Sequence, residues 1–316
     1  MHDLSLITLE LVETSNYEIV DRQLREATEK VGVPRSILSD QGSDIVKGAR
    51  LFQDSHANTL VCKDMAHATA VALKKELTSD ERWNTFVSQC GATQPKVKQT
   101  ELGYLAPAKL KVKGRYMNLG ALIGWGGSML NVLDTPKADR PDDVDLERLD
   151  EKFGWVSDYR QAIAEWSRLH EIKNVVLNFS RVEGYHATAA DQLQSLLAPL
   201  AIHDSGRRVA RNLVGVVRAQ SAALRDEESL PASSEILESL IGKGKRLSGQ
   251  HTRGGFTKNV LAMAASLVEL TDETILTALE TCGEKHLRQW CTDSVGTSLT
   301  ALRRRILPAK NGTNTG

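Results

Sequence analysis

The first forty residues alternate between short apolar runs and one amphipathic segment. Residues 4–12 are β-branched and roughly alternate in polarity, which predicts a strand with one buried face. From Tyr17 to Val31, apolar residues recur at helical spacing between charged ones, and Gly32 predicts the end of that helix. Ile37 begins the next predicted strand. Because a strand–helix–strand order of this length favours a parallel pair, we expect Asp40 at the carboxyl end of a buried strand, where active sites often lie.

The pattern changes to a mainly helical one after a further short strand. Residues 59–62 form that strand, and a helix rich in Ala is predicted from Met65 to Leu77. The chain is then almost wholly helical to about residue 231, apart from two predicted breaks. One is a glycine-rich stretch over 114–127, and the other is an acidic, Pro-containing linker over 134–143.

Composition narrows the range of partners and compartments. The 316 residues include forty basic and forty acidic ones, so any surface that binds nucleic acid must be local. The four cysteines have neither metal-ligand spacing nor the density of a secreted scaffold, which favours a reducing cytosol. The chain has no run of roughly twenty apolar residues and no signal-peptide pattern. We therefore expect a soluble intracellular protein that does not enter a membrane.

Two acidic residues far apart in sequence are the main candidates for chemistry. Asp40 lies in Ser-Asp-Gln-Gly at a predicted strand end, and Glu238 lies in a Ser-x-x-x-Glu sequence on a predicted helix with Lys245 seven residues later. Carboxylates gathered in this way hold the paired divalent cations of a two-metal nuclease. The alternatives are a turn aspartate and a solvated glutamate on an amphipathic helix. Glu235, one turn before Glu238, is a second candidate.

Asp64 and His67 form an Asp-x-x-His element directly after the second predicted strand. The two residues are one helical turn apart and can share a face. A local cap of the helix is the alternative interpretation of this element. A zinc site is excluded because no further ligands have suitable spacing.

These elements, in this order, resemble the DDE-type transposases of bacterial insertion sequences, over residues 1 to about 260. The resemblance implies an α/β protein with a partial RNase H-like core, a large all-α insertion and a helical carboxyl-terminal region. The expected divisions are as follows: 1–78, first part of the catalytic core; 79–230, helical insertion; 231–310, catalytic helix and helical region; 311–316, disordered tail.

The resemblance also implies roles for these residues. Asp40 and Glu238 would be catalytic residues and ligands of two Mg²⁺ or Mn²⁺ ions, with Asp64 and His67 in support and Gly42 allowing close backbone approach. The implied reaction is cleavage and strand transfer at the ends of an insertion sequence, in which water and then a 3′-hydroxyl attack phosphodiesters. The implied partners are DNA and further copies of the chain in a homo-oligomer, and the implied location is the bacterial cytoplasm, at the nucleoid when DNA is bound.

Basic and aromatic residues supply candidate DNA contacts, because cations neutralise phosphates and aromatic rings stack on exposed bases. Each candidate has a plain alternative: a solvated charged helix for the cations, and hydrophobic packing for the tryptophan. Trp155 and Trp166 are expected to be helical core residues. The candidate DNA contacts are Lys243, Lys245, Arg246, Lys111, Lys113, Arg115 and Trp125.

The chain departs from the family pattern at its amino end, where two strands and the first catalytic Asp are not found. We therefore expect an N-terminally truncated transposase with weak or no activity alone. The alternative is a non-catalytic derivative that binds DNA or dimerises, and a third interpretation is a helical scaffold without a nucleic-acid role.

Overall fold

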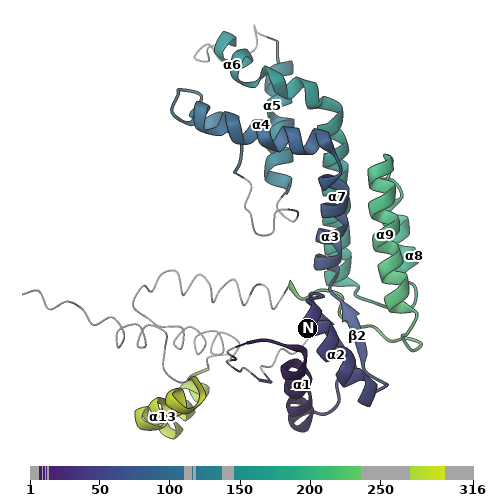
Figure 1. The fold of residues 1–316 in the computed structure, drawn as a ribbon, viewed down its shortest axis with the longest axis vertical. Coiled ribbons are helices and arrows are strands. Elements are labelled where there is room, and N and C mark those ends of the chain that lie inside the picture. Colours follow the sequence, from purple (N-terminus) through teal and green to yellow (C-terminus); the bar gives the residue numbers. More distant parts are fainter. Residues whose placement is uncertain are drawn as a thin grey trace, which may run out of the picture. The chain divides into compact units, whose positions relative to one another are not determined.

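The structure is a computed structural model that describes residues 7–8, 10, 12, 14–109, 116, 119–136, 146–235, 239 and 271–295. The described residues are mostly helical and include one two-stranded parallel sheet (Figure 1). The chain divides into two compact units. Unit 1 comprises residues 1–37, 42–61 and 234–316, and unit 2 comprises residues 38–41 and 62–233. The main boundaries between the two units therefore lie near residues 61 and 233. The divisions expected from the sequence lie after residues 78 and 230.

The first helix of unit 1, α1 (Tyr17–Val31), has the bounds that the sequence predicts. The side chain of Asn16 accepts a hydrogen bond from the backbone N–H of Ile19 and caps the amino end. Gly32 ends the helix at φ 86°, a left-handed conformation that glycine adopts without a steric penalty. α1 packs against α2 (Ser43–Ser55).

The glycine at position 48 sets the distance between α1 and α2. A β-carbon there would lie 2.6 Å from the carbonyl oxygen of Tyr17 and 2.6 Å from Cβ of Val20. No real β-carbon approaches other atoms so closely, so this contact requires glycine.

The sheet consists of β1 (Ser36–Ser39) and β2 (Leu60–Lys63). The N–H of Leu60 donates to the carbonyl of Arg35 at 2.9 Å, and the N–H of Asp64 donates to that of Ser39 at 3.0 Å. Both residue numbers rise together along the pair, as in a parallel ladder. The predicted strands at 37–38 and 59–62 are thus found and lie parallel to each other, whereas the parallel pair that the sequence predicts, residues 4–12 with the strand at Ile37, is not the pair observed.

The predicted strand over residues 4–12 is wrong at its four described positions, 7, 8, 10 and 12, which lie outside any strand. The side chain of Glu10 contacts α1. The carboxylate of Glu10 accepts hydrogen bonds from Arg22 at 2.7 Å and from Gln23 at 2.8 Å. An alternating period alone does not distinguish a strand from an extended segment outside any sheet.

Unit 2 is built from α-helices and two short 3₁₀ segments. Helices α3, α7 and α9 pack against one another, and α8 packs against α7 and α9 (Figure 1). The bounds are α3 (Met65–Thr78), α4 (Glu81–Lys98), η1 (Gly103–Leu105), α5 (Leu119–Asp134), α6 (Leu146–Phe153), η3 (Gly154–Tyr159), α7 (Arg160–Val182), α8 (Ala189–Leu197) and α9 (Asp204–Ser221). Two further helices, α12 (Asp272–Thr281) and α13 (Glu284–Val295), are assigned to unit 1.

Aromatic side chains form much of the core between α4, α5, η3 and α7. Trp166 is 1% exposed, and its ring meets that of Trp83 edge-on, with centroids 4.9 Å apart. Phe86 is fully buried and lies 5.2 Å from Trp166 and 5.7 Å from Trp155 between ring centroids. The prediction that Trp166 is a core residue is confirmed, and Trp155 is half-buried against the same cluster.

The glycine-rich stretch predicted as a break is helical from Leu119 onward. Two of its glycines serve helix packing. A β-carbon on Gly120 would lie 2.5 Å from Cε1 of His170, and one on Gly126 would lie 3.0 Å from Cδ1 of Ile163. The glycines therefore let α5 approach α7 closely, and this tertiary contact outweighs their low helix propensity. The second predicted break begins where α5 ends, with 135–136 outside any helix and 137–143 outside the described residues.

The two ends of residues 62–233, the longer segment of unit 2, are joined by hydrogen bonds around the end of β2. The N–H of Met65 donates to the carbonyl of Ala232 at 2.9 Å, and the N–H of Lys63 donates to Oε1 of Gln220 at 3.0 Å. The buried hydroxyl of Tyr185 donates to the carbonyl of Lys63 at 2.5 Å. Segments separated by more than a hundred residues thus meet at one strand end.

Candidate functional site

The end of the sheet brings two of the predicted site residues to one edge. Asp40 directly follows β1, Asp64 directly follows β2, and the two strands are neighbours. The hydrogen bond from the N–H of Asp64 to the carbonyl of Ser39 joins the strands at this point. Carboxyl ends of parallel strands are where open α/β sheets place their ligands.

The turn after Asp40 has an unusual backbone. Asp40 is exposed, and Gln41 has φ 66°, the left-handed region that residues with a side chain seldom adopt. Gly42 has φ −55° and is the N-cap residue of α2 without a side-chain hydrogen bond. The left-handed conformation therefore falls on Gln41 rather than on the glycine. Such conformations cluster at functional sites but also occur in ordinary turns.

Asp64 caps the amino end of α3. Its Oδ1 accepts hydrogen bonds from the N–H groups of Ala66 at 2.6 Å and His67 at 3.2 Å, and the residue is 1% exposed. His67 is exposed, and its hydrogen bond to Asp64 comes from the backbone N–H of His67. This geometry is that of the local cap, so any support for a site at Asp40 comes from the rigid end of α3.

The other half of the predicted carboxylate pair lies outside the described residues. Glu238 is not among the described residues. The same is true of six predicted DNA-contacting cations: Lys243, Lys245, Arg246, Lys111, Lys113 and Arg115. Glu235, the second candidate, is described and is half-buried. Within the described ranges, no three His, Cys, Asp or Glu side chains converge as a metal site would require. Asp40 is therefore the one member of the pair that the described part of the chain supplies.

Trp125 lies in the aromatic core of unit 2. Its indole N–H donates to the carbonyl of Leu105 at 2.8 Å, and its ring lies 6.2 Å from those of Phe153 and Trp155 between centroids. The residue is half-buried. These contacts match the packing role that the sequence analysis gives as the alternative to base stacking.

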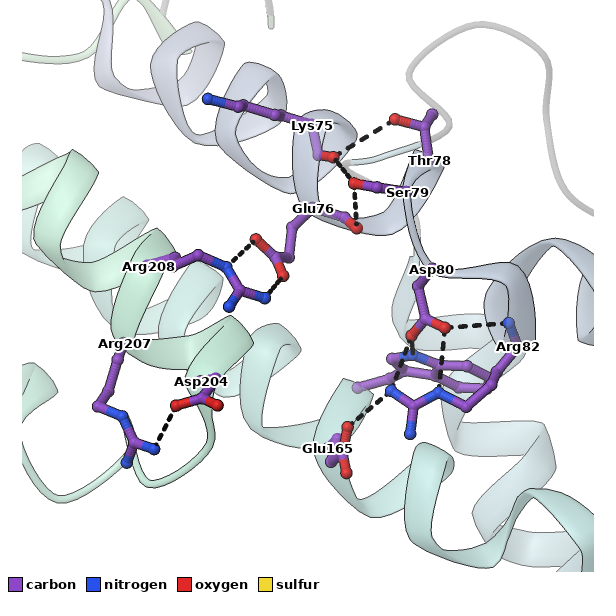
Figure 2. A network of polar contacts seen from close by, with 11 residues as sticks. Lys75, Glu76, Thr78, Ser79, Asp80, Arg82, Glu165, Asp204, Arg207 and Arg208 are labelled. Carbon is purple, nitrogen blue, oxygen red and sulfur yellow. Dashed lines mark hydrogen bonds and ion pairs between the residues drawn. The ribbon is translucent and has the colours of Figure 1, made fainter.

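A charged cavity that the sequence analysis does not identify lies at the corner between α3 and α4. It has a volume of about 750 Å³ and is also lined by the first turn of α9 (Figure 2). Arg208 pairs with Glu76 across α3 and α9, and Arg82 bridges Asp80 and Glu165 at 3.0 and 2.8 Å.

The charges of this cavity balance one another. The four cations are Lys75, Arg82, Arg207 and Arg208, and the four carboxylates are Glu76, Asp80, Glu165 and Asp204. Burial raises the pKa of Asp80, but hydrogen bonds from Arg82 and Trp166 outweigh it and hold that pKa below its usual range. Three of the four cations are paired with these carboxylates, so the cavity has no net formal charge and its ion pairs fix helices to one another.

The sequence analysis also overlooks the arginines of α9, although their spacing is visible in the sequence. They recur at positions 207, 208, 211 and 218, a helical period along one 18-residue element. The predicted helical character of this region, combined with that period, is sufficient to place three of them on one face.

No protein-family model, curated protein or solved structure matches this chain. The class of protein is therefore the one that the described residues define, a mainly helical protein with a small parallel two-stranded sheet. None of the helices in the described ranges combines the length and the apolar character that crossing a membrane requires.

Proposed function

We propose that this protein acts on DNA as a transposase of the DDE type, with an RNase H-like core and with Asp40 and Glu238 as its metal-binding carboxylates. One observation carries the proposal. Asp40 and Asp64 follow two hydrogen-bonded parallel strands at the same edge of the sheet, with the N–H of Asp64 3.0 Å from the carbonyl of Ser39. The order of the sequence elements that resemble the family supplies the rest of the argument.

The donor chemistry fits a hard divalent cation. Carboxylate oxygens are the ligands that Mg²⁺ and Mn²⁺ prefer, and Asp40 is exposed at the end of a strand. When bound, two such ions would stabilise charge on the attacking and leaving oxygens of a phosphodiester. Asp64 already uses Oδ1 for two backbone N–H groups, so its role in the proposal is to hold the strand end in position.

The test is Mn²⁺ binding, measured by electron paramagnetic resonance on the full chain. We expect Asp40→Asn and Glu238→Gln each to weaken Mn²⁺ binding and the double variant to abolish it. Asp44→Asn is the matched control, because Asp44 is an exposed carboxylate in the first turn of α2, close to Asp40 in sequence. Binding that persists in the double variant contradicts the assigned ligands.

Assays of DNA binding and DNA nicking on the same protein preparations distinguish a catalytic protein from one that only binds DNA. If wild-type protein binds duplex DNA but neither binds Mn²⁺ nor nicks the DNA in its presence, the non-catalytic DNA-binding derivative is the better assignment. The proposal also implies a homo-oligomer, which sedimentation equilibrium measures directly.

A further inference from the structure

Helix α9 carries a row of arginines on one face. Positions 207, 211 and 218 are separated by four and seven residues, so the three side chains leave the helix in nearly the same direction. At a rise of about 1.5 Å per residue, the row is about 16 Å long. Over its eighteen residues, α9 has four arginines, no lysine and one acidic residue, Asp204.

Packing of the opposite side fixes the direction of this row. Val209, Leu213 and Val217 are at most 2% exposed, and they belong to the face of α9 that contacts α3, α7 and α8. The helix cannot rotate without exposing that face. The arginines are therefore presented on a rigid element, which limits the entropy lost when they bind a ligand.

The carboxylates near the row are exposed and hold its ends weakly. Arg207 pairs with Asp204 at 2.6 Å, with 51% and 80% of the two side chains exposed. Arg218 pairs with Asp191 at 3.1 Å, with 58% and 82% exposed. Exposed pairs of this kind contribute little to stability and are readily exchanged for another anion.

The middle of the row is available. Arg211 is exposed and makes no hydrogen bond or ion pair with any residue that the structure describes. Arg208, on the neighbouring side of α9, pairs with Glu76 and belongs to the balanced cavity (Figure 2). The row meets the edge of the cavity at Arg207, whereas Arg211 and Arg218 lie outside the cavity lining.

We propose that the row Arg207, Arg211 and Arg218 binds successive phosphates of one DNA strand. The inference rests on the proposed function, since it takes DNA as the partner. A guanidinium donates two hydrogen bonds to one phosphate, and it is the cationic group best suited to that contact. A strand of duplex DNA has a phosphate every 3.4 Å or so along its axis, so a row of about 16 Å spans several of them. Such contacts fix register and carry no sequence information.

The experiment measures binding of a fluorescent 20-base-pair duplex of arbitrary sequence, by anisotropy, between 50 and 200 mM NaCl. We expect the triple variant R207Q/R211Q/R218Q to bind about tenfold more weakly or worse at 100 mM, with a salt slope lower by about 2 to 3, since each lost phosphate contact removes about 0.9 from it. Arg211→Gln alone removes a cation that has no described partner, so it tests the row without leaving a carboxylate unpaired.

The matched control is R148Q/R160Q/R168Q, which removes the same charge from unit 2. These three arginines are each about half exposed and paired with carboxylates, but they lie on α6 and α7. We expect this variant to bind DNA almost as wild type does. Equal loss in both triple variants shows an effect of net charge and overturns the assigned row.

The failures of the two proposals are distinguishable. If wild-type protein binds the duplex and the α9 triple variant binds equally well, the row is wrong and the proposed function stands. If wild-type protein does not bind duplex DNA even at 50 mM NaCl, the proposed function fails and the row fails with it.

Discussion

Gly120 in α5 lies against the imidazole ring of His170 in α7, so closely that a β-carbon on Gly120 would be 2.5 Å from Cε1 and 2.6 Å from Nε2. We expect Gly120→Ala to destabilise the protein by about 1–3 kcal/mol, because the ring must move within a packed interface. Urea denaturation followed by circular dichroism measures this change.

Gly124, in the same helix, is the matched control. Nothing lies within 4 Å of a β-carbon built there, so Gly124→Ala meets no obstacle. Since alanine has the higher helix propensity, we expect this variant to gain up to about 1 kcal/mol. Equal destabilisation by the two substitutions contradicts the close approach of α5 and α7.

The same histidine predicts a pH dependence of stability. Burial, with a smaller contribution from Lys173, lowers the pKa of His170. The unfolded chain therefore takes up a proton at this position at higher pH than the folded chain does, near pH 6.5. The contribution of neutral His170 to the free energy of unfolding is complete above about pH 6.5, and it is lost as the pH falls from there toward the pKa of the folded state.

The measurement is the free energy of unfolding at pH 7.5 and at pH 5.5. We expect wild-type protein to lose stability between these values and His170→Gln to lose less, because glutamine does not titrate. An identical loss in both proteins shows that other groups govern this range.

Asp64 offers a test of capping against catalysis. Asp64→Ala removes the acceptor of two backbone N–H groups at the start of α3, and we expect a loss of about 0.5–2 kcal/mol. Asp64→Asn keeps an oxygen that can cap, so we expect it to retain most of that stability. Thermal unfolding of the two variants checks this. A large loss in Asp64→Asn indicates that the charge itself is needed at this buried position.

The cysteines predict a pattern of thiol reactivity. Burial raises the pKa of Cys90 to about 12, and Cys62 is also buried, whereas Cys282 is exposed. Because the thiolate is the reactive form, we expect iodoacetamide at pH 8 to label Cys282 quickly and to label the two buried cysteines only after unfolding. Mass spectrometry of digested protein gives the order of labelling, and rapid labelling of Cys90 in folded protein contradicts its burial.

Local signals in the sequence were sufficient to predict the elements whose bounds are set by neighbouring residues. The helical spacing of apolar residues and the glycine at position 32 identify α1, and the apolar run before Asp40 identifies β1. Gly120 shows the opposite case. In isolation a glycine indicates a break, and only the ring of His170 reveals why a helix carries it.

In the candidate site, too, some features follow from the sequence and others depend on tertiary contacts. The position of Asp40 after a strand follows from the apolar pattern, and it is found there, although the strand over 4–12 that the crossover argument used is not. The spacing of Asp64 is compatible with two interpretations, a helix cap and a residue that supports a catalytic site. In both cases an acidic residue directly precedes a helix. The row on α9 is visible as a period of arginines, but which side of α9 is buried depends on contacts with α3, α7 and α8.

The hydrogen bonds that join Met65 to Ala232 and Lys63 to Gln220 also bear on how the order of this chain can be rearranged. When the two ends of a segment lie close together, the segment can be inserted or removed with only a short connection between the residues on either side of it. Residues 62–233, which together with 38–41 make up unit 2, therefore begin and end close together in space, as circular permutation of a segment requires.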